Sequence, residues 1–393
     1  MLVQKYGGTS VATTDKIFLI AKKLKKRLGN KKAIIVVSAM SGETDFLTGL
    51  GKKIDGNFSK REMDQLISVG ENKTISLLAI ALNKMSVKSV SLTGWQAGVV
   101  TDDRFGNAFI EKIKLKKIRE KLKENQVVVV AGFQGVDKNN NITTLGKGGS
   151  DTTAVALASV FNCPCEIYTD VNGIFSADPK ILPNAKKLKE ISYGELMEMS
   201  SNGAKVMETR SVEIAEKFSV DLRVGKSLGN IKEGTRIMKK TKLEDLVIKN
   251  IATQDNIAVL NYECEGQEDV HLLLEELYVL SQKLLLVSLI KNNQKKIFSC
   301  VIDQELIKKI QKNSKFNNKK LKIQKNLCKI TLTGNGLATH TLIPKMIFQK
   351  LSEEKILFQN ITISEISLSF TVDLDCKIKT VKILAELLGL EEK

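Results

Sequence analysis

Two glycine-rich segments place a lysine and small residues where backbone N–H groups can face an anion. The first is "KYGGTS" at residues 5–10 and the second is "LGKGGSDTT" at residues 145–153. Glycine lacks a Cβ, so its backbone can approach a ligand, and the second segment leads into a predicted helix whose N-terminus favours negative charge. A strand-to-helix turn explains the first segment equally well on its own, but two such segments favour a phosphate site. Neither matches GxxxxGK[ST] or GxGxxG.

Composition limits the classes of protein to which the chain can belong. Its 393 residues suffice for two or three domains, and no run of 18 apolar residues exists, so no membrane span is expected. The first residues lack the apolar stretch of a signal peptide, so we expect a cytoplasmic protein. The formal charge of +17 comes mostly from lysines on predicted solvated helix faces, such as residues 22–32 and 111–124, with few aromatic residues among them. Neither a membrane nor a nucleic acid is expected as a partner.

Cysteine and histidine usage argues against metal and redox chemistry. The six cysteines are scattered through the chain, where reduced, mostly buried thiols with a structural role are expected. Cys163 and Cys165 do not have the CxxC spacing, and no histidine lies near them. His271 and His340 are the only histidines, so neither a zinc or iron site nor a histidine-based triad is expected.

The first part of the chain alternates between predicted strands and predicted amphipathic helices. The predicted strands are residues 2–6, 33–38, 88–92, 126–132, 165–169 and 220–224. The predicted helices are residues 13–28, 60–82, 112–124, 150–160 and 209–218. Near-continuous apolar strands separated by helices indicate an α/β fold with a parallel-rich sheet between helices. Ligands are then expected at the carboxyl ends of the strands.

From residue 239 the pattern changes to a charged connector followed by shorter elements. A strand-helix-strand-strand-helix order occurs twice, which is typical of small ferredoxin-like modules. The predicted elements are residues 256–261, 268–282, 284–290, 296–302 and 303–312, and then 327–333, 342–353, 361–371 and 376–388. The segment "LTGNGLATH" at residues 332–340 is not a dinucleotide motif, because Thr339 stands where the third glycine is needed.

Seven motifs occur in an order that resembles the aspartate kinases of the amino-acid kinase family. They are "KYGGTS", "VVSAMSGETD", "SVGE", "GWQAG" with "TD", "LGKGGSDTTAVALA", "IYTDVNGIFSADPK" and "GAKV". The resemblance implies an amino-acid kinase catalytic domain over 1–238, a linker over 239–246, and two ferredoxin-like ACT modules over 247–393. The implied reaction is ATP-dependent phosphorylation of the side-chain carboxylate of L-aspartate, giving 4-phospho-L-aspartate. This is the first step of lysine, threonine, methionine and diaminopimelate synthesis.

The resemblance also assigns roles at the phosphate side of the site. Lys5 supplies a fixed cation to the transferring phosphoryl group, and Asp151 lies beside the reacting groups, although its position also suits an ordinary helix N-cap. Mg²⁺ is expected to accompany ATP without a dedicated protein cage. The implied ATP-binding residues are Lys5, Tyr6, Gly7, Gly8, Thr169, Asp170, Phe175, Lys180, Lys205 and Val206.

On the acceptor side, the site must recognise two carboxylates and one ammonium group. The resemblance assigns these contacts to Ser38, Thr44, Glu71, Lys147 and Ser150, with Glu71 pairing with the ammonium. Family members usually carry arginine where this chain has Lys147, and lysine cannot grip a carboxylate with two parallel hydrogen bonds, so weaker aspartate binding is expected. A His-Pro pair often follows "GAKV" in the family. This chain has Met207, Glu208 and Thr209 there, and these receive no role.

Two other classes of protein would share part of this pattern. Another amino-acid kinase would have the fold but should lack Glu71 in "SVGE" and the ACT tail. A catalytically silent ACT-type amino-acid sensor would keep the tail but lose Lys5, Gly8 and Asp151, all of which are present. The tail is expected to form a homodimer or larger oligomer. It is also expected to carry feedback control by an aspartate-family amino acid, with lysine as the first choice. Its first strand-to-helix loop (261–277) is acidic and poor in glycine, so a role in dimerisation alone stays open.

Overall fold

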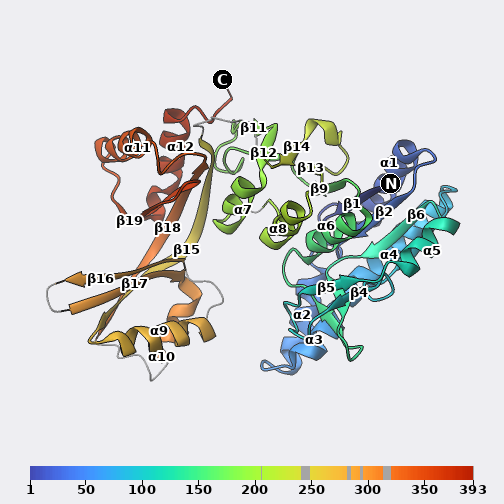
Figure 1. Cartoon of the computed structure of the whole chain (residues 1–393), viewed down its shortest axis with the longest axis horizontal. Coiled ribbons are helices and arrows are strands. Elements are labelled where there is room, and N and C mark those ends of the chain that lie inside the picture. Colours follow the sequence, from blue (N-terminus) through green and yellow to red (C-terminus); the bar gives the residue numbers. More distant parts are fainter. Residues whose placement is uncertain (205, 240–247, 281–284, 293–294, 313–319, 393) are drawn as a thin grey trace. The chain divides into compact units, whose positions relative to one another are not determined.

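The chain folds into two compact units. The computed structural model describes residues 1–204, 206–239, 248–280, 285–292, 295–312 and 320–392 (Figure 1). The first unit comprises Met1–Ile174, Lys187–Ser200 and Lys205–Leu243, and the second comprises Phe175–Lys186, Ser201–Ala204 and Glu244–Lys393. Two short segments of the expected first domain therefore pack with the second unit. Of the expected linker 239–246, only Lys239 lies within the described residues.

The first unit is built on an eight-stranded sheet in the order β12-β14-β13-β9-β1-β2-β6-β3. All neighbouring strands run parallel except β13 and β14, so the predicted parallel-rich sheet is confirmed. β12 and β14 were not predicted, and the other six match predicted strands to within two residues. The bounds are β1 Leu2–Tyr6, β2 Ala33–Val37, β3 Ser89–Leu92, β6 Val127–Ala131, β9 Cys165–Thr169, β12 Glu190–Ser192, β13 Leu222–Lys226 and β14 Thr235–Met238.

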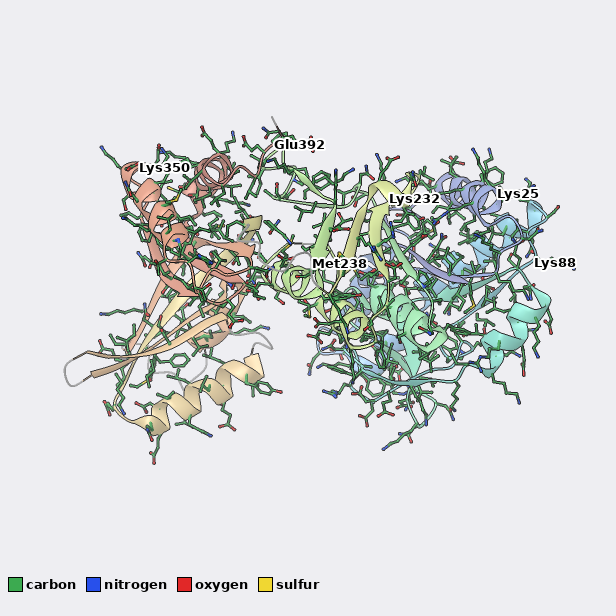
Figure 2. All side chains as sticks on the ribbon, turned by 45° about the horizontal axis from the view of Figure 1, so that its top comes forward. Lys25, Lys88, Lys232, Met238, Lys350 and Glu392 are labelled. Carbon is green, nitrogen blue, oxygen red and sulfur yellow. The ribbon has the colours of Figure 1, made fainter. Side chains whose placement is uncertain are left out.

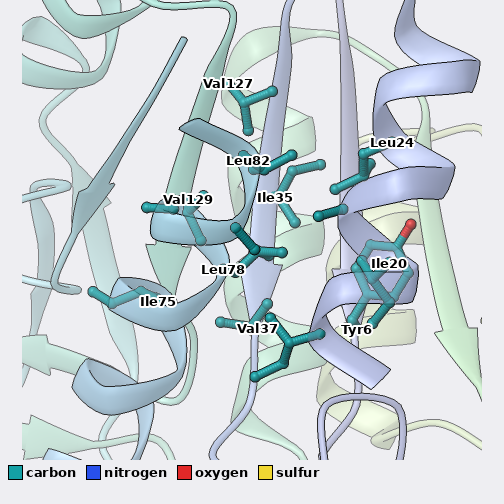
Figure 3. Close-up of a cluster of buried hydrophobic side chains, with 14 of the residues drawn as sticks. Tyr6, Ile20, Leu24, Ile35, Val37, Ile75, Leu78, Leu82, Val127 and Val129 are labelled. Carbon is teal, nitrogen blue, oxygen red and sulfur yellow. The ribbon is translucent and has the colours of Figure 1, made fainter. Parts of the chain in front are cut away.

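Helices α1 (Thr14–Leu28) and α4 (Val69–Lys84) cover one face of this sheet, and their apolar sides form its main core (Figure 3). Thr13 caps α1 by accepting a hydrogen bond from the Lys16 backbone N–H (3.3 Å), as side-chain oxygens do at helix starts. Helix α6 (Gly149–Phe161) packs against β1, β2 and β9. The remaining helices are α2 Glu43–Ile54, α3 Lys60–Ile67, α5 Lys116–Glu124, α7 Tyr193–Ser201 and α8 Thr209–Lys217, with the short η1 Ile231–Glu233.

A second, four-stranded sheet in the order β5-β4-β7-β8 was not predicted. Its strands are β4 Val99–Thr101, β5 Ile110–Ile113, β7 Gln134–Val136 and β8 Ile142–Thr144. Strands of three or four residues are too short to show an alternating pattern, and the start of the predicted helix 112–124 belongs to β5. The short strands β10 Ile174–Phe175 and β11 Lys187–Leu188 form a separate pair.

The second unit is a six-stranded antiparallel sheet in the order β16-β17-β15-β18-β20-β19. The doubled strand-helix-strand-strand-helix order is confirmed, and β15 and β18 pair at the centre. The two halves have separate cores. The bounds are β15 Ile248–Cys264, α9 Gln267–Leu280, β16 Leu285–Asn292, β17 Lys295–Asp303, η2 Gln304–Leu306, α10 Ile307–Lys312, β18 Leu321–Gly334, α11 Leu342–Glu353, β19 Phe358–Ile363, β20 Ser367–Asp373, η4 Leu374–Cys376 and α12 Lys377–Leu387.

The placement of lysines and cysteines can be compared with the expectations from the sequence, which were solvent-exposed lysines and mostly buried, unpaired cysteines. Lys25, Lys88 and Lys232 are exposed side chains that project from three separate segments of the first unit, as Figure 2 shows. All six cysteines are unpaired, and four of them are buried while Cys163 and Cys376 are half-buried. In the described part of the chain, no helix is long and apolar enough to cross a membrane.

Candidate functional site

Most of the predicted site residues lie at or just beyond the carboxyl ends of central strands of the eight-stranded sheet, or on helices next to them. Strands β13, β9, β1 and β2 are parallel neighbours, so the loops that follow them leave the sheet on the same side. Backbone hydrogen bonds continue beyond the strands: the Ser38 N–H donates to Tyr6 O (3.1 Å) and the Ser227 N–H donates to Thr169 O (2.9 Å). This continued pairing fixes the spacing of the loops that carry the predicted site.

A lysine–aspartate pair stands at these strand ends. Lys5 lies near the end of β1, and Asp151 lies in the first turn of α6, which begins after Gly148 in the left-handed conformation (φ 75°). Lys5 Nζ is 2.6 Å from Asp151 Oδ1, and the two side chains are only 12% and 10% exposed. Because the pair is largely removed from water, the ammonium group is held in one place at the edge of the sheet.

Two glycines allow the loops around this pair to come into contact. A Cβ on Gly8 would lie 2.9 Å from the carbonyl oxygen of Ala39, in the loop after β2. A Cβ on Gly132, after β6, would lie 2.6 Å from the Cβ of Ser150 at the start of α6. Either side chain would force the loops apart, so glycine is required by close approach at both positions.

Glu71 is a buried carboxylate next to the same loops. It lies on α4 with 3% of its surface exposed, and its Oε1 accepts a hydrogen bond from the Ala39 backbone N–H (2.9 Å). Its other oxygen, Oε2, is also buried and has no hydrogen-bond partner among the described residues. Burial raises the pKa of Glu71 from 4.5 to about 8. An orphaned carboxylate oxygen of this kind suits a cationic partner.

A hollow of about 180 Å³ lies beyond the ends of β1, β9 and β13. Its hydroxyl and lysine groups suit phosphate oxygens. The predicted residues Thr169 and Asp170 line it, with Thr169 Oγ1 donating to Asp170 Oδ1 (2.8 Å). The other lining residues, which sequence reasoning did not single out, are Thr9, Ser10, Lys16, Lys226, Ser227 and Leu228.

Four further residues predicted for the acceptor side lie in the loop after β2, at the start of α2, and in the segment that leads into α6. Ser38 directly follows β2 and is half-buried, and Thr44 is half-buried in the first turn of α2. Lys147 is exposed in the loop between β8 and α6, and Ser150 is 5% exposed. The structure thus brings Ser150 beside Gly132, and Ser38 beside the Ala39–Glu71 contact.

Tyr6, which was predicted to bind the nucleotide, has its side chain in the core. The ring is fully buried under α1 (Figure 3) and stacks on Tyr168 with ring centroids 4.8 Å apart. Strand alternation directs Lys5 and Tyr6 to opposite faces of the sheet. Only the backbone of Tyr6 is left to contact a nucleotide.

Phe175, Lys180 and Val206 were also predicted to bind the nucleotide, but they are not among the residues that line the hollow. Phe175 and Lys180 belong to the second unit, where the Asn250 side chain donates to Phe175 O (3.0 Å) and Lys180 is exposed. Lys205 lies outside the described residues. Val206 is half-buried ahead of α8 in the first unit.

Glu208, which received no role from the sequence, lies close to the lysine–aspartate pair. It caps α8 by accepting from the Ser211 backbone N–H (3.2 Å). A Cβ on Gly148 would lie 2.5 Å from the Cβ of Glu208. Burial raises the pKa of Glu208, and the negative charge of Asp151 adds to this effect. No signal in the sequence joins residue 208 to residue 148, since the contact depends on how α8 packs against α6.

The arrangement is suited to transfer between two anions. Around the same strand ends lie a fixed ammonium group, a hollow lined by two lysines, and a buried carboxylate with one oxygen that has no partner among the described residues. No cluster of three or more His, Cys, Asp or Glu side chains that could hold a metal ion occurs in the described residues. A metal ion that arrives on a triphosphate keeps several waters and needs no such cluster.

Comparisons with known proteins identify the family of the chain. The sequence profile of the amino acid kinase family matches residues 1–226. The chain is 36% identical to an aspartokinase of Geobacillus stearothermophilus, covering 100% of this chain and 98% of the relative. It is 37% identical to an aspartokinase of Helicobacter pylori strain 26695, with 95% of each chain covered.

Solved structures show the same fold. E. coli aspartokinase III in complex with aspartate and ADP matches with a TM-score of 0.82 at 22% identity, covering 99% of this chain and all of the other. Clostridium acetobutylicum aspartate kinase matches with a TM-score of 0.76 at 24% identity, again over 99% of this chain and all of the other. The matched fold therefore extends over both units of the chain.

Proposed function

We propose that this chain, which belongs to the amino acid kinase family and within it to the aspartokinases, transfers the γ-phosphoryl group of ATP to the side-chain carboxylate of L-aspartate. The product is 4-phospho-L-aspartate, the entry compound of lysine, threonine, methionine and diaminopimelate synthesis in the cytoplasm. Full-length similarity to aspartokinases supports the substrate, as does the E. coli relative that binds aspartate and ADP.

The observation that carries the proposal is the Lys5–Asp151 pair at the end of β1. Phosphoryl transfer needs little covalent help from a protein, and catalysis depends on positioning and on stabilising the charge that spreads over the phosphoryl oxygens. Lys5 supplies a fixed positive charge at that point, and Asp151 holds its ammonium group in place. Mg²⁺ bound to ATP would neutralise part of the phosphate charge, and the carboxylates of Asp151 and Asp170 would be available to hold it.

The acceptor side uses Glu71 for the ammonium group of aspartate. Its Oε2 is buried and has no hydrogen-bond partner among the described residues, and an ammonium group placed there would both donate to this oxygen and balance the carboxylate charge. Ser150, at the N-terminus of α6, and Lys147 supply positive potential for a carboxylate. Ser38 and Thr44 add hydroxyl donors at the loop after β2 and at the start of α2.

The nucleotide side uses the hollow at the ends of β1, β9 and β13. Lys16, Lys226 and the hydroxyls of Thr9 and Ser10 suit phosphate oxygens. Thr169 and Asp170 line the same hollow. Phe175, Lys180, Lys205 and Val206 are proposed as further nucleotide contacts on the strength of the motif alone.

The second unit is proposed to pair subunits through its ACT-like modules. It is also proposed to bind a feedback amino acid, with lysine as the first choice. The doubled βαββα order supports the module assignment, and E. coli aspartokinase III has a structure in complex with lysine and aspartate. A silent sensor is disfavoured by the intact Lys5–Asp151 pair, and another amino-acid kinase is disfavoured by the buried Glu71.

A coupled ADP-release assay with a panel of acceptors tests the proposed function. Aspartate is expected to support turnover, while glutamate, N-acetylglutamate and UMP are not. Turnover with one of those three and none with aspartate would overturn the substrate assignment, and no turnover with any acceptor would favour the sensor.

A further inference from the structure

Asp64 is an almost completely buried carboxylate outside the site described above. It lies on α3 with 1% of its surface exposed. Its Oδ2 accepts hydrogen bonds from the backbone N–H groups of Gly106 (2.9 Å) and Thr144 (2.7 Å), and its Oδ1 accepts from Thr144 Oγ1 (2.8 Å). Three donors that face one buried carboxylate make a strong, directional attachment.

The attached segment leads directly into the acceptor loop, defined here as residues 145–150. Thr144 is the last residue of β8, three positions before Lys147 and six before Ser150. Its carbonyl oxygen accepts from the Ala108 N–H (2.8 Å), so the loop that contains Gly106 is joined to the same point. Asp64 therefore ties α3 to both the start of the acceptor loop and the loop beside it.

Arg210 on α8 holds the next peptide from another direction. Its guanidinium group donates to Leu145 O and, at 3.0 Å, to Ala108 O. The guanidinium also lies over the ring of Phe109, 4.8 Å from the ring centroid. The acceptor loop thus begins between a carboxylate that holds Thr144 N–H and a guanidinium that holds Leu145 O.

We propose that Asp64 is a positioning residue that sets the acceptor loop, and with it Lys147 and Ser150, in the geometry that binds the substrate carboxylate. This inference rests on the proposed function for the identity of the substrate. The hydrogen bonds of Asp64 end at Thr144 and Gly106, and neither of these residues lines the hollow beyond β1, β9 and β13. Loss of the carboxylate is therefore expected to weaken aspartate binding and to leave ATP binding largely unchanged.

Asp137, in the turn between β7 and β8, offers a matched control. It is 3% exposed, and its carboxylate accepts from the backbone N–H groups of Asn139 and Asn141, both at 2.8 Å. These bonds close the turn between β7 and β8 and do not involve the acceptor loop. Asp64→Ala and Asp137→Ala therefore remove the same group from two buried backbone-binding positions.

The test measures KM for aspartate and for ATP in four variants, together with hydrogen exchange of the peptide that covers residues 144–150. Asp64→Ala is expected to raise KM for aspartate at least tenfold, to change KM for ATP less than twofold, and to speed exchange of that peptide. Asp64→Asn keeps an oxygen acceptor and is expected to restore KM for aspartate to within about threefold of wild type. Asp137→Ala should leave both KM values and the exchange of the peptide unchanged.

Thr144→Val, which removes only the Thr144 Oγ1 bond, keeps the inference testable if Asp64→Ala does not fold. A two- to fivefold rise in KM for aspartate with faster exchange is then expected. Equal changes in both KM values, or unchanged exchange in folded Asp64→Ala or Thr144→Val, would overturn the positioning role. Wild-type enzyme without aspartate turnover would instead overturn the proposed function, and the exchange measurement would still decide whether Asp64 holds the loop.

Discussion

Glu71 makes aspartate binding and protein stability depend on pH in opposite directions. Burial raises its pKa from 4.5 to about 8, a shift that corresponds to at most about 5 kcal/mol at 1.36 kcal/mol per pKa unit. The folded protein therefore binds more protons than the unfolded chain between these two pKa values. The stability associated with protonated Glu71 is fully present below pH 4.5 and is lost as the pH rises through about 8.

Substrate binding has the opposite requirement, because an ammonium group needs a carboxylate partner. Below pH 8 the free protein must release a proton from Glu71 before it can pair with aspartate. KM for aspartate is therefore expected to fall by about tenfold per pH unit from pH 6 to 8 and to level off above this range. Glu71→Gln cannot titrate, so its KM for aspartate is expected to be high and independent of pH, while KM for ATP stays near the wild-type value.

Two measurements check this reasoning. Initial rates of ADP release at saturating ATP give KM for aspartate across the pH range, with ionic strength held constant because salt screens charge pairs. Urea unfolding at pH 5 and pH 9 gives the free energy of unfolding. As the pH rises from 5 to 9, the free energy of unfolding of Glu71→Gln is expected to increase by several kcal/mol relative to that of the wild type. A wild-type KM that does not change between pH 6 and 8 would refute the assignment of Glu71 to the ammonium group.

Three further predictions follow from the same geometry. Lys5→Ala is expected to lower kcat by on the order of 10²-fold or more, because it removes a preorganised charge, and also to lower the melting temperature, because Asp151 loses its partner while largely buried; near-normal kcat in steady-state ADP release would contradict the role of Lys5. Lys147→Arg is expected to lower KM for aspartate several-fold, since a guanidinium can grip a carboxylate with two hydrogen bonds, and an unchanged or raised KM would show that Lys147 does not contact the substrate. Lysine titrated at sub-saturating aspartate is expected to shift apparent affinity by about 5- to 150-fold, whereas a flat response to lysine, threonine and methionine up to millimolar levels would leave the second unit as an assembly module.

The long apolar strands were predictable because burial on both faces of a parallel sheet leaves a continuous apolar run. Val127–Ala131 and Ala33–Val37 are fully buried examples. Helix α2 was not predicted, because Gly49 and Gly51 lie inside it and glycine has low helix propensity. Propensity was overridden there by the position of the segment after the β2 loop.

The division of the predicted helix 60–82 has a tertiary cause. α3 ends and α4 begins around Ser68, whose carbonyl oxygen accepts a hydrogen bond from the Gln134 side chain (2.9 Å). A carbonyl bound from outside is diverted from the helical ladder, and such insertions bend or break helices. Since Gln134 lies on β7, in a sheet that was itself unpredicted, the apolar pattern of residues 60–82 could not reveal the break.

Some residues of the candidate site stand in local sequence motifs, whereas others were found only from the packing of the structure. Lys5, Glu71 and Asp151 could be proposed as site residues from the sequence, because each stands in a short segment with a recognisable pattern. Asp64, Glu208 and Lys226 could not, since each reaches the site only through the packing of α3, α8 or β13 against other elements. A residue that supports a site through tertiary contacts leaves no spacing in the sequence from which to identify it.

In the motif "KYGGTS", neighbouring residues have different structural roles, so each residue has to be assigned separately. Lys5 and Tyr6 are neighbours in β1, but the pleat directs Lys5 towards Asp151 and Tyr6 into the core, where it pairs in register with Tyr168 and donates to Gln4 Oε1 (3.1 Å). The alternation is visible in the sequence once the strand is placed. One face of β1 therefore presents Lys5 to Asp151, and the other face packs Tyr6 into the core with α1.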